Sequence, residues 1–222
     1  MNQPAPQQQT SLPLHPLEPS GDLTHSSDQN AKAESRRYGV RDAAFQAAAQ
    51  GGGENYFSAF ALFLHASPFH IGILSALPQL VGVVAQLLSV KLLQYLRMPA
   101  QLLIGGGWAQ ALCWLPILSL PLLLPEHGPW LLIGCAMLYF AFGHATAPVW
   151  NSLLVDVVET SSRGAYFAQR ARVTALTSFV ALGIAGTVLT LGQKWELSWI
   201  GFLFIFLGAA AARVGATRCQ TR

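Results

Sequence analysis

Long apolar stretches alternate with short polar connections from about residue 44 to the end of the chain. A helix needs ~20 mostly apolar residues to cross a bilayer, and six stretches reach about that length: residues 44–65, 71–94, 100–124, 129–153, 173–193 and 197–217. The two prolines of PEHGP, between the third and fourth stretches, are expected to end one helix and begin the next. The pattern therefore predicts an all-α membrane protein with six transmembrane helices.

Composition agrees with the membrane class and divides the chain. Hydrophobic residues make up 52% of the sequence and charged residues 10%, whereas soluble domains carry about 25% charged residues. The N-terminal part is instead rich in Gln, Pro and Ser, a composition that cannot bury enough apolar surface to fold. We expect a disordered cytoplasmic tail over residues 1–40, a six-helix transmembrane domain over 41–217 and a short cytoplasmic tail over 218–222.

The basic residues predict the orientation. All of the 13 lysines and arginines except Lys194 precede the first stretch, follow the sixth or lie in connections on the same side, and Arg213 is counted with those after the sixth. Basic loops stay in the cytoplasm, so both termini are predicted to be cytoplasmic. The net charge of +3 comes with no basic cluster on a soluble domain, and a nucleic-acid partner is not expected.

One carboxylate lies in the middle of an apolar stretch. Glu54 is roughly 15 Å from either end of the first stretch, where a charge costs at least ~2.5–3.5 kcal/mol and normally faces a cavity or a partner. Gln46 and Gln50 precede it at intervals of four residues, which places all three on one helix face. We interpret Glu54, Gln50, Gln46 and the adjacent Asn55 as candidates for a solute or ion pathway.

Polar positions in the other stretches are less specific, because single Ser, Thr, Gly and Gln residues usually serve helix packing. From these stretches we add Gln79, His144 and Asn151 to the candidate pathway, although the position of His144 near one end of its stretch also fits a membrane interface. The sixth stretch, LSWIGFLFIFLGAAAA, is nearly featureless. It is predicted to face lipid.

Sequence motifs for other chemistry are absent. There is no HExxH, CxxC, Walker A or nucleophile motif in the sequence, and the three cysteines are too scattered for a disulfide framework. We therefore expect no metal site, no cofactor and no enzymatic activity. An intramembrane enzyme stays open as a minor alternative that lacks a visible nucleophile–base pair.

Two segments resemble a known family. ENYFSAFALFLHASPFHIGILSALPQLVGVVAQLLSVKLLQYL is similar to the first two helices of bacterial major facilitator superfamily (MFS) transporters, and FGHATAPVWNSLLVDVVETSSRGAYFAQRAR is similar to their fourth helix and the following loop. The resemblance covers roughly residues 40–217. It implies a fold of three plus three helices, in which the first, second, fourth and fifth line the cavity and the third and sixth lie outside.

The resemblance also implies an inner gate. Asp156, Arg163 and Arg170 would form it at the cytoplasmic surface through charge-assisted hydrogen bonds. In the connection KLLQYLRMPA the family usually has an acid and several bases; here Gln94 stands near the position of the acid and Arg97 is the remaining base. The gate is therefore expected to differ from the family pattern at this connection.

Such transporters have two six-helix halves with the substrate site between them, so the resemblance implies an N-terminal half. The expected function is transport of a small solute, coupled to protons or cations through Glu54. The expected partners are the lipid bilayer, an unidentified small molecule, and a second six-helix half or a second copy of the chain. A truncated remnant without transport activity, or a regulatory or assembly protein of the membrane, stays open as the alternative.

Overall fold

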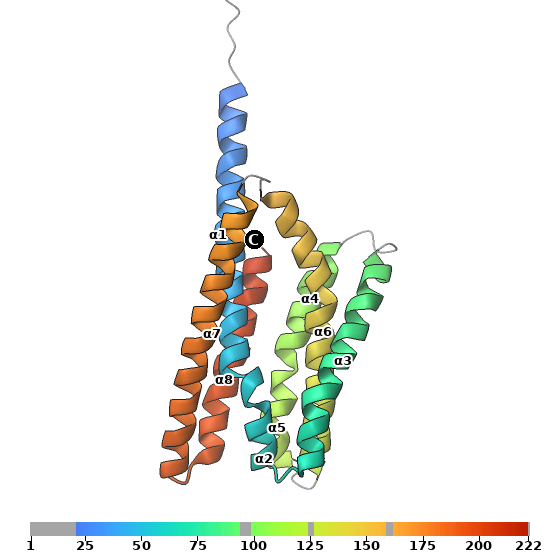
Figure 1. The fold of residues 1–222 in the computed structure, drawn as a ribbon, viewed down its shortest axis with the longest axis vertical. Coiled ribbons are helices and arrows are strands. Elements are labelled where there is room, and N and C mark those ends of the chain that lie inside the picture. Colours follow the sequence, from blue (N-terminus) through green and yellow to red (C-terminus); the bar gives the residue numbers. More distant parts are fainter. Residues whose placement is uncertain (1–20, 94–98, 124–126, 159–161, 222) are drawn as a thin grey trace, which may run out of the picture.

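The computed structural model describes residues 21–93, 99–123, 127–158 and 162–221, and every regular element among them is a helix (Figure 1). The elements are α1 (Gly21–Gly52), the 3₁₀ helix η1 (Glu54–Tyr56), α2 (Phe57–Phe63), α3 (Pro68–Leu93), α4 (Pro99–Leu112), α5 (Trp114–Leu123), α6 (Gly128–Val157), α7 (Arg163–Lys194) and α8 (Ser198–Gln220). The all-α prediction is thus confirmed for these residues.

Five helical segments are long and apolar enough to cross a membrane. They are Pro68–Lys91, Ala100–Leu122, Gly128–Leu153, Arg163–Lys194 and Ser198–Gln220. The second of these is divided at Cys113 into α4 and α5, since Pro116 has no N–H to donate to the carbonyl of Leu112. The predicted first stretch, residues 44–65, is not among the five because its helix is interrupted.

The interruption falls at three successive glycines, residues 51–53. Each glycine weakens a helix by about 1 kcal/mol relative to alanine, and here they also permit close packing. A β-carbon on Gly51 would overlap the backbone of Ser178 in α7, and one on Gly53 would overlap Ala209 in α8 and Trp114 in α5. At the break the chain therefore lies in close contact with α5, α7 and α8. It then continues as η1, which begins at Glu54.

The N-terminal tail differs from the expectation. Residues 1–20 lie outside the described part of the chain, but α1 already begins at Gly21, within the segment expected to be disordered. The segment from Gly21 to Gly52 contains no proline and has seven Ala, three Gln and three Arg residues, which favour helix. Helix propensity decides the structure here, whereas the expectation rested on the low hydrophobicity of residues 1–40 as a whole.

The helices form two packing groups. α1 packs against α7 and α8, α6 packs against α3 and α4, and α4 and α8 join the two groups. Figure 1 shows that the segment α1–η1–α2 runs from one end of the bundle to the other, and that α8 ends on the side from which α1 enters. The described N- and C-terminal segments thus lie toward the same end.

An aromatic core occupies the opposite end of the bundle, where α2, α5 and the start of α8 meet. Phe57, Trp114, Tyr139 and Phe206 lie with their ring centroids about 5 to 6 Å apart, for example 5.3 Å between Trp114 and Phe206. These rings belong to one cluster of buried, mostly apolar side chains. Directly next to it, on the side of the chain termini, the bundle is hollow.

The prediction that the sixth stretch faces lipid fits only one face of α8, where Phe204 and Leu207 are exposed. The other face is packed inside the bundle, and its buried residues are Gly201, Phe202, Ile205, Phe206, Ala209, Arg213, Ala216 and Thr217. A helix that is apolar on all sides has no stripe to show which face is buried. Its small residues, such as the run of alanines at 209–212, are the feature that suits close helix packing.

Candidate functional site

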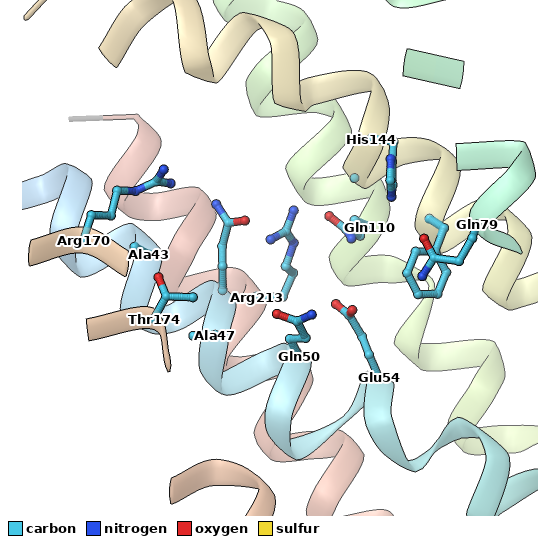
Figure 2. A pocket seen from close by; sticks show the side chains of 13 residues that line it. Ala43, Ala47, Gln50, Glu54, Gln79, Gln110, His144, Arg170, Thr174 and Arg213 are labelled. Carbon is cyan, nitrogen blue, oxygen red and sulfur yellow. The ribbon is translucent and has the colours of Figure 1, made fainter. Parts of the chain in front are cut away.

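The hollow is a cavity of about 390 Å³ between the helices. Its lining comes from α1, η1, α3, α4, α6, α7 and α8 (Figure 2). The lining residues are Ala43, Gln46, Ala47, Gln50, Glu54, Gln79, Gln110, Phe140, Gly143, His144, Arg170, Thr174 and Arg213. Most of them carry polar or charged side chains, which is unusual inside a set of apolar helices.

Glu54 is held at the boundary between the cavity and the aromatic core. The hydroxyl group of Tyr139 donates a hydrogen bond of 2.6 Å to Oε1 of Glu54. The ring of Tyr139 packs against Phe57 and Trp114 in the core. Tyr139 thereby holds the carboxylate from the side of the aromatic core, while the other side of Glu54 faces the cavity.

Arg213 is the main functional residue that the sequence did not indicate. It was expected beyond the sixth span, but it lies inside α8, is only 6% exposed and lines the cavity. Its guanidinium group is close enough to both the Glu54 and Asp42 carboxylates for electrostatic attraction. The flanking small residues Ala212 and Gly215 are a signal that Arg213 continues a packed helix.

Asp42 is a second buried acid that the sequence reasoning passed over. It is 0% exposed and accepts hydrogen bonds from Gln46 Nε2 (3.0 and 2.8 Å) and Gln220 Nε2 (2.9 Å). Arg170 Nη2 lies 3.7 Å from its Oδ2. The two amides and Arg170 thus surround the buried Asp42 carboxylate with hydrogen-bond donors and positive charge.

Five of the predicted pathway residues come together in the cavity. Gln46, Gln50, Glu54, Gln79 and His144 all line it, so the four-residue spacing on the first stretch correctly identified one wall.

The two asparagines of the predicted pathway lie elsewhere. Asn55 and Asn151 are exposed and are not part of the lining. For Asn55 the reason is the 3₁₀ turn, since it points adjacent residues in different directions and only Glu54 faces inward. Several other polar residues of the spans, among them Ser75 and Thr187, donate their hydroxyl groups to carbonyls of their own helix, as packing residues commonly do.

The predicted cytoplasmic gate is only partly described. Arg97 lies outside the described residues, and the backbone of Asp156 belongs to α6. Arg163 Nε donates to the backbone carbonyl of Val158 at 3.1 Å. Arg170 meets Asp42 of α1, at 3.7 Å between Nη2 and Oδ2.

Three buried polar atoms that line the cavity have no hydrogen-bond partner among the described residues. They are Gln110 Oε1, Arg170 Nε and Arg213 Nε. Gln110 is 4% exposed, and its amide occupies space left by Gly143, where a β-carbon would overlap it. Buried polar groups normally have partners, so this set indicates a place for a polar ligand or water.

Together these features define an all-helical protein with a charged polar cavity among helices that are long and apolar enough to cross a membrane. Within the described ranges, no group of three or more His, Cys, Asp or Glu side chains could hold a metal ion. Comparisons with protein-family models, curated proteins and solved structures found no match to the chain.

Proposed function

We propose that this protein is an MFS-type half-transporter that moves a small polar solute across the membrane, with Glu54 as the proton- or cation-coupling residue. The observation that carries the proposal is the cavity itself. It places one carboxylate and two arginines among helices that are long and apolar enough to span a bilayer. Buried ionisable groups in such helices mark ion and substrate pathways.

The segment α1–η1–α2, the first along the chain, is proposed as a further span beside the five. It runs the length of the bundle (Figure 1), and its break beside Glu54 resembles the discontinuous helices that form binding sites in secondary transporters. Non-helical backbone at membrane depth is tolerated where protein covers it or where it lines a cavity. Gly51 and Gly53 are buried, and Glu54 lines the cavity, so both conditions are met.

The packing pairs support a three-plus-three arrangement. The first span, α1–η1–α2, packs on the fifth and sixth spans, α7 and α8, while the fourth span, α6, packs on the second and third, α3 and α4. If spans one, two and three are exchanged with spans four, five and six, the pairs 1–5 and 1–6 become the pairs 4–2 and 4–3. This equivalence is expected for an internal repeat. Transport would then involve a second six-helix half or a second copy of the chain.

Orientation and location in the proposal follow the basic residues. Arg36, Arg37 and Arg41 lie on α1 before the apolar stretch, and Arg218 lies in the last turn of α8. Both helix ends are on the same side of the bundle, which would be cytoplasmic in a bacterial inner membrane.

Proton flux in liposomes tests the proposal. Purified protein is reconstituted with the pH dye pyranine inside, and L-lactate, succinate, phosphate, glycine or glucose is added in turn. We expect at least one solute to change the internal pH beyond the change in empty liposomes. Glu54→Gln should abolish this flux while leaving membrane insertion intact, because the amide cannot carry the proton.

Glu196→Gln is the matched control, since Glu196 is an exposed acid in the connection between α7 and α8. It should transport like the wild type. Absence of flux with every solute would favour the non-transporting remnant, and normal flux in Glu54→Gln would make Glu54 a structural residue only.

A further inference from the structure

The side chains that line the cavity carry more positive than negative formal charge. Two cations, Arg170 and Arg213, line it, but Glu54 is the lining acid. Asp42 is fully buried, outside the lining, and forms the ion pair with Arg170. Arg213 is attracted to both acids, but Glu54 is the one that lines the cavity, so the charge at the cavity wall depends on the ionisation of Glu54.

Arg213 also has unused hydrogen-bonding capacity. Its Nε atom has no partner among the described residues, and Figure 2 shows its guanidinium group pointing into the space shared with Gln50, Glu54 and Gln110. A guanidinium group presents its N–H donors in a planar fork that matches the two oxygens of a carboxylate or a phosphate. The amides of Gln50 and Gln110 offer further donors beside it.

We infer that the cavity binds a small oxyanion, a carboxylate or a phosphate, on Arg213, and that a proton on Glu54 releases Arg213 for this ligand. The inference rests on the proposed transport function and names its substrate class and coupling. When Glu54 is ionised it attracts Arg213 and repels an incoming anion. When Glu54 is protonated the anion takes its place, so one proton and one monoanion enter together and the charge of the site is unchanged.

Other charged and titratable groups face Glu54 as well. Tyr139 of α6 and Arg213 of α8 act on it directly, His144 of α6 and Arg170 of α7 line the same cavity, and Asp42 of α1 lies outside the lining, paired with Arg170. Of these, His144 could also donate a ring N–H to an anion. The experiment must therefore separate Glu54 from His144.

Binding is measured by calorimetry on the full chain in detergent with three ligand pairs: L-lactate and L-lactamide, benzoate and benzamide, and glycerol 3-phosphate and glycerol. A cavity of about 390 Å³ lies at the small end of ligand sites and accommodates each of them. We expect at least one anion to bind while its neutral counterpart does not. With a carboxylate, affinity should rise up to about tenfold for each unit that the pH falls, with uptake of one proton.

Variants test the assignment. Glu54→Gln should bind the anion tightly at every pH and take up no proton, even though it cannot transport. Arg213→Lys should weaken binding because the planar fork is lost, whereas Arg172→Gln, which removes an exposed arginine of α7, should not change it. His144→Asn should keep the pH dependence.

The outcomes separate this inference from the proposed function. Anion binding with the expected pH dependence but no flux would support the oxyanion site and overturn transport. Proton flux driven by glucose or glycine without anion binding would support transport and overturn the oxyanion site. Equal binding of the neutral counterparts, or a pH dependence that persists in Glu54→Gln and disappears in His144→Asn, would also overturn it.

Discussion

The two ends of the bundle have different interiors although the same apolar helices build both. On the side of the chain termini the helices surround a cavity with Glu54, Arg170 and Arg213. On the other side Phe57, Trp114, Phe206 and their neighbours form a cluster of buried, mostly aromatic side chains. The difference shows that mean hydropathy identifies the spans, while a few charged residues decide which part of the interior is hollow.

Tyr139 connects the two regions. Its ring belongs to the aromatic core, and its hydroxyl group holds the Glu54 carboxylate at 2.6 Å. The core therefore serves as a rigid support for Glu54, because packed neighbours hold the side chains of a site in position. Changes in the core should affect stability, and changes in the cavity should affect ligand binding and proton movement.

The largest stability effect is expected in the aromatic core. Phe206→Ala removes a side chain that is 0% exposed, and leaves an unfilled space between Phe57, Phe60 and Trp114. We expect the free energy of unfolding to fall by about 3–5 kcal/mol, measured by denaturation in mixed micelles. Phe204→Ala on the same helix, where Phe204 is 65% exposed, should change it by less than about 0.5 kcal/mol. Equal losses would show that the core is not packed as described.

A smaller loss is expected at the break between the two regions. Gly51→Ala would push a β-carbon into the Ser178 backbone, and overpacking of this kind costs about 1–3 kcal/mol. Gly134→Ala in α6 is the control, because a β-carbon there meets nothing within 4 Å; it should leave stability unchanged or raise it by up to about 1 kcal/mol. Thermal unfolding of both variants in detergent checks this. A destabilised Gly134→Ala beside a normal Gly51→Ala would contradict the close approach of α1 and α7.

The sequence was most informative where a rare residue stood in a regular pattern. The four-residue spacing of Gln46, Gln50 and Glu54 correctly predicted one wall of the cavity. Hydropathy predicted the helices that are long and apolar enough to span a membrane. It did not predict the break at Gly51–Gly53, because the cost of glycine in a helix is small and only the contacts with α7 and α8 require it there.

Arg213 and Asp42 were missed for a shared reason. Each lies near the end of an apolar stretch, where a charged residue usually marks the membrane interface. Both helices continue past that point, α8 to Gln220 and α1 back to Gly21, so these charges are buried among helices. The burial of these two side chains depends on how the helices pack together, and the sequence pattern of a single helix cannot predict it.

Thiol labelling tests the contrast between the two regions most directly. In a background where Cys113, Cys135 and Cys219 are replaced by serine, single cysteines are introduced at Gln50, which lines the cavity, and at Ala61, which is buried in the core. Each is treated in membranes with a charged, water-soluble methanethiosulfonate, which reacts with thiols that water can reach. The account predicts rapid labelling at position 50 and almost none at position 61. Equal rates at the two positions, or faster labelling at 61, would contradict a hydrated cavity beside a dry core.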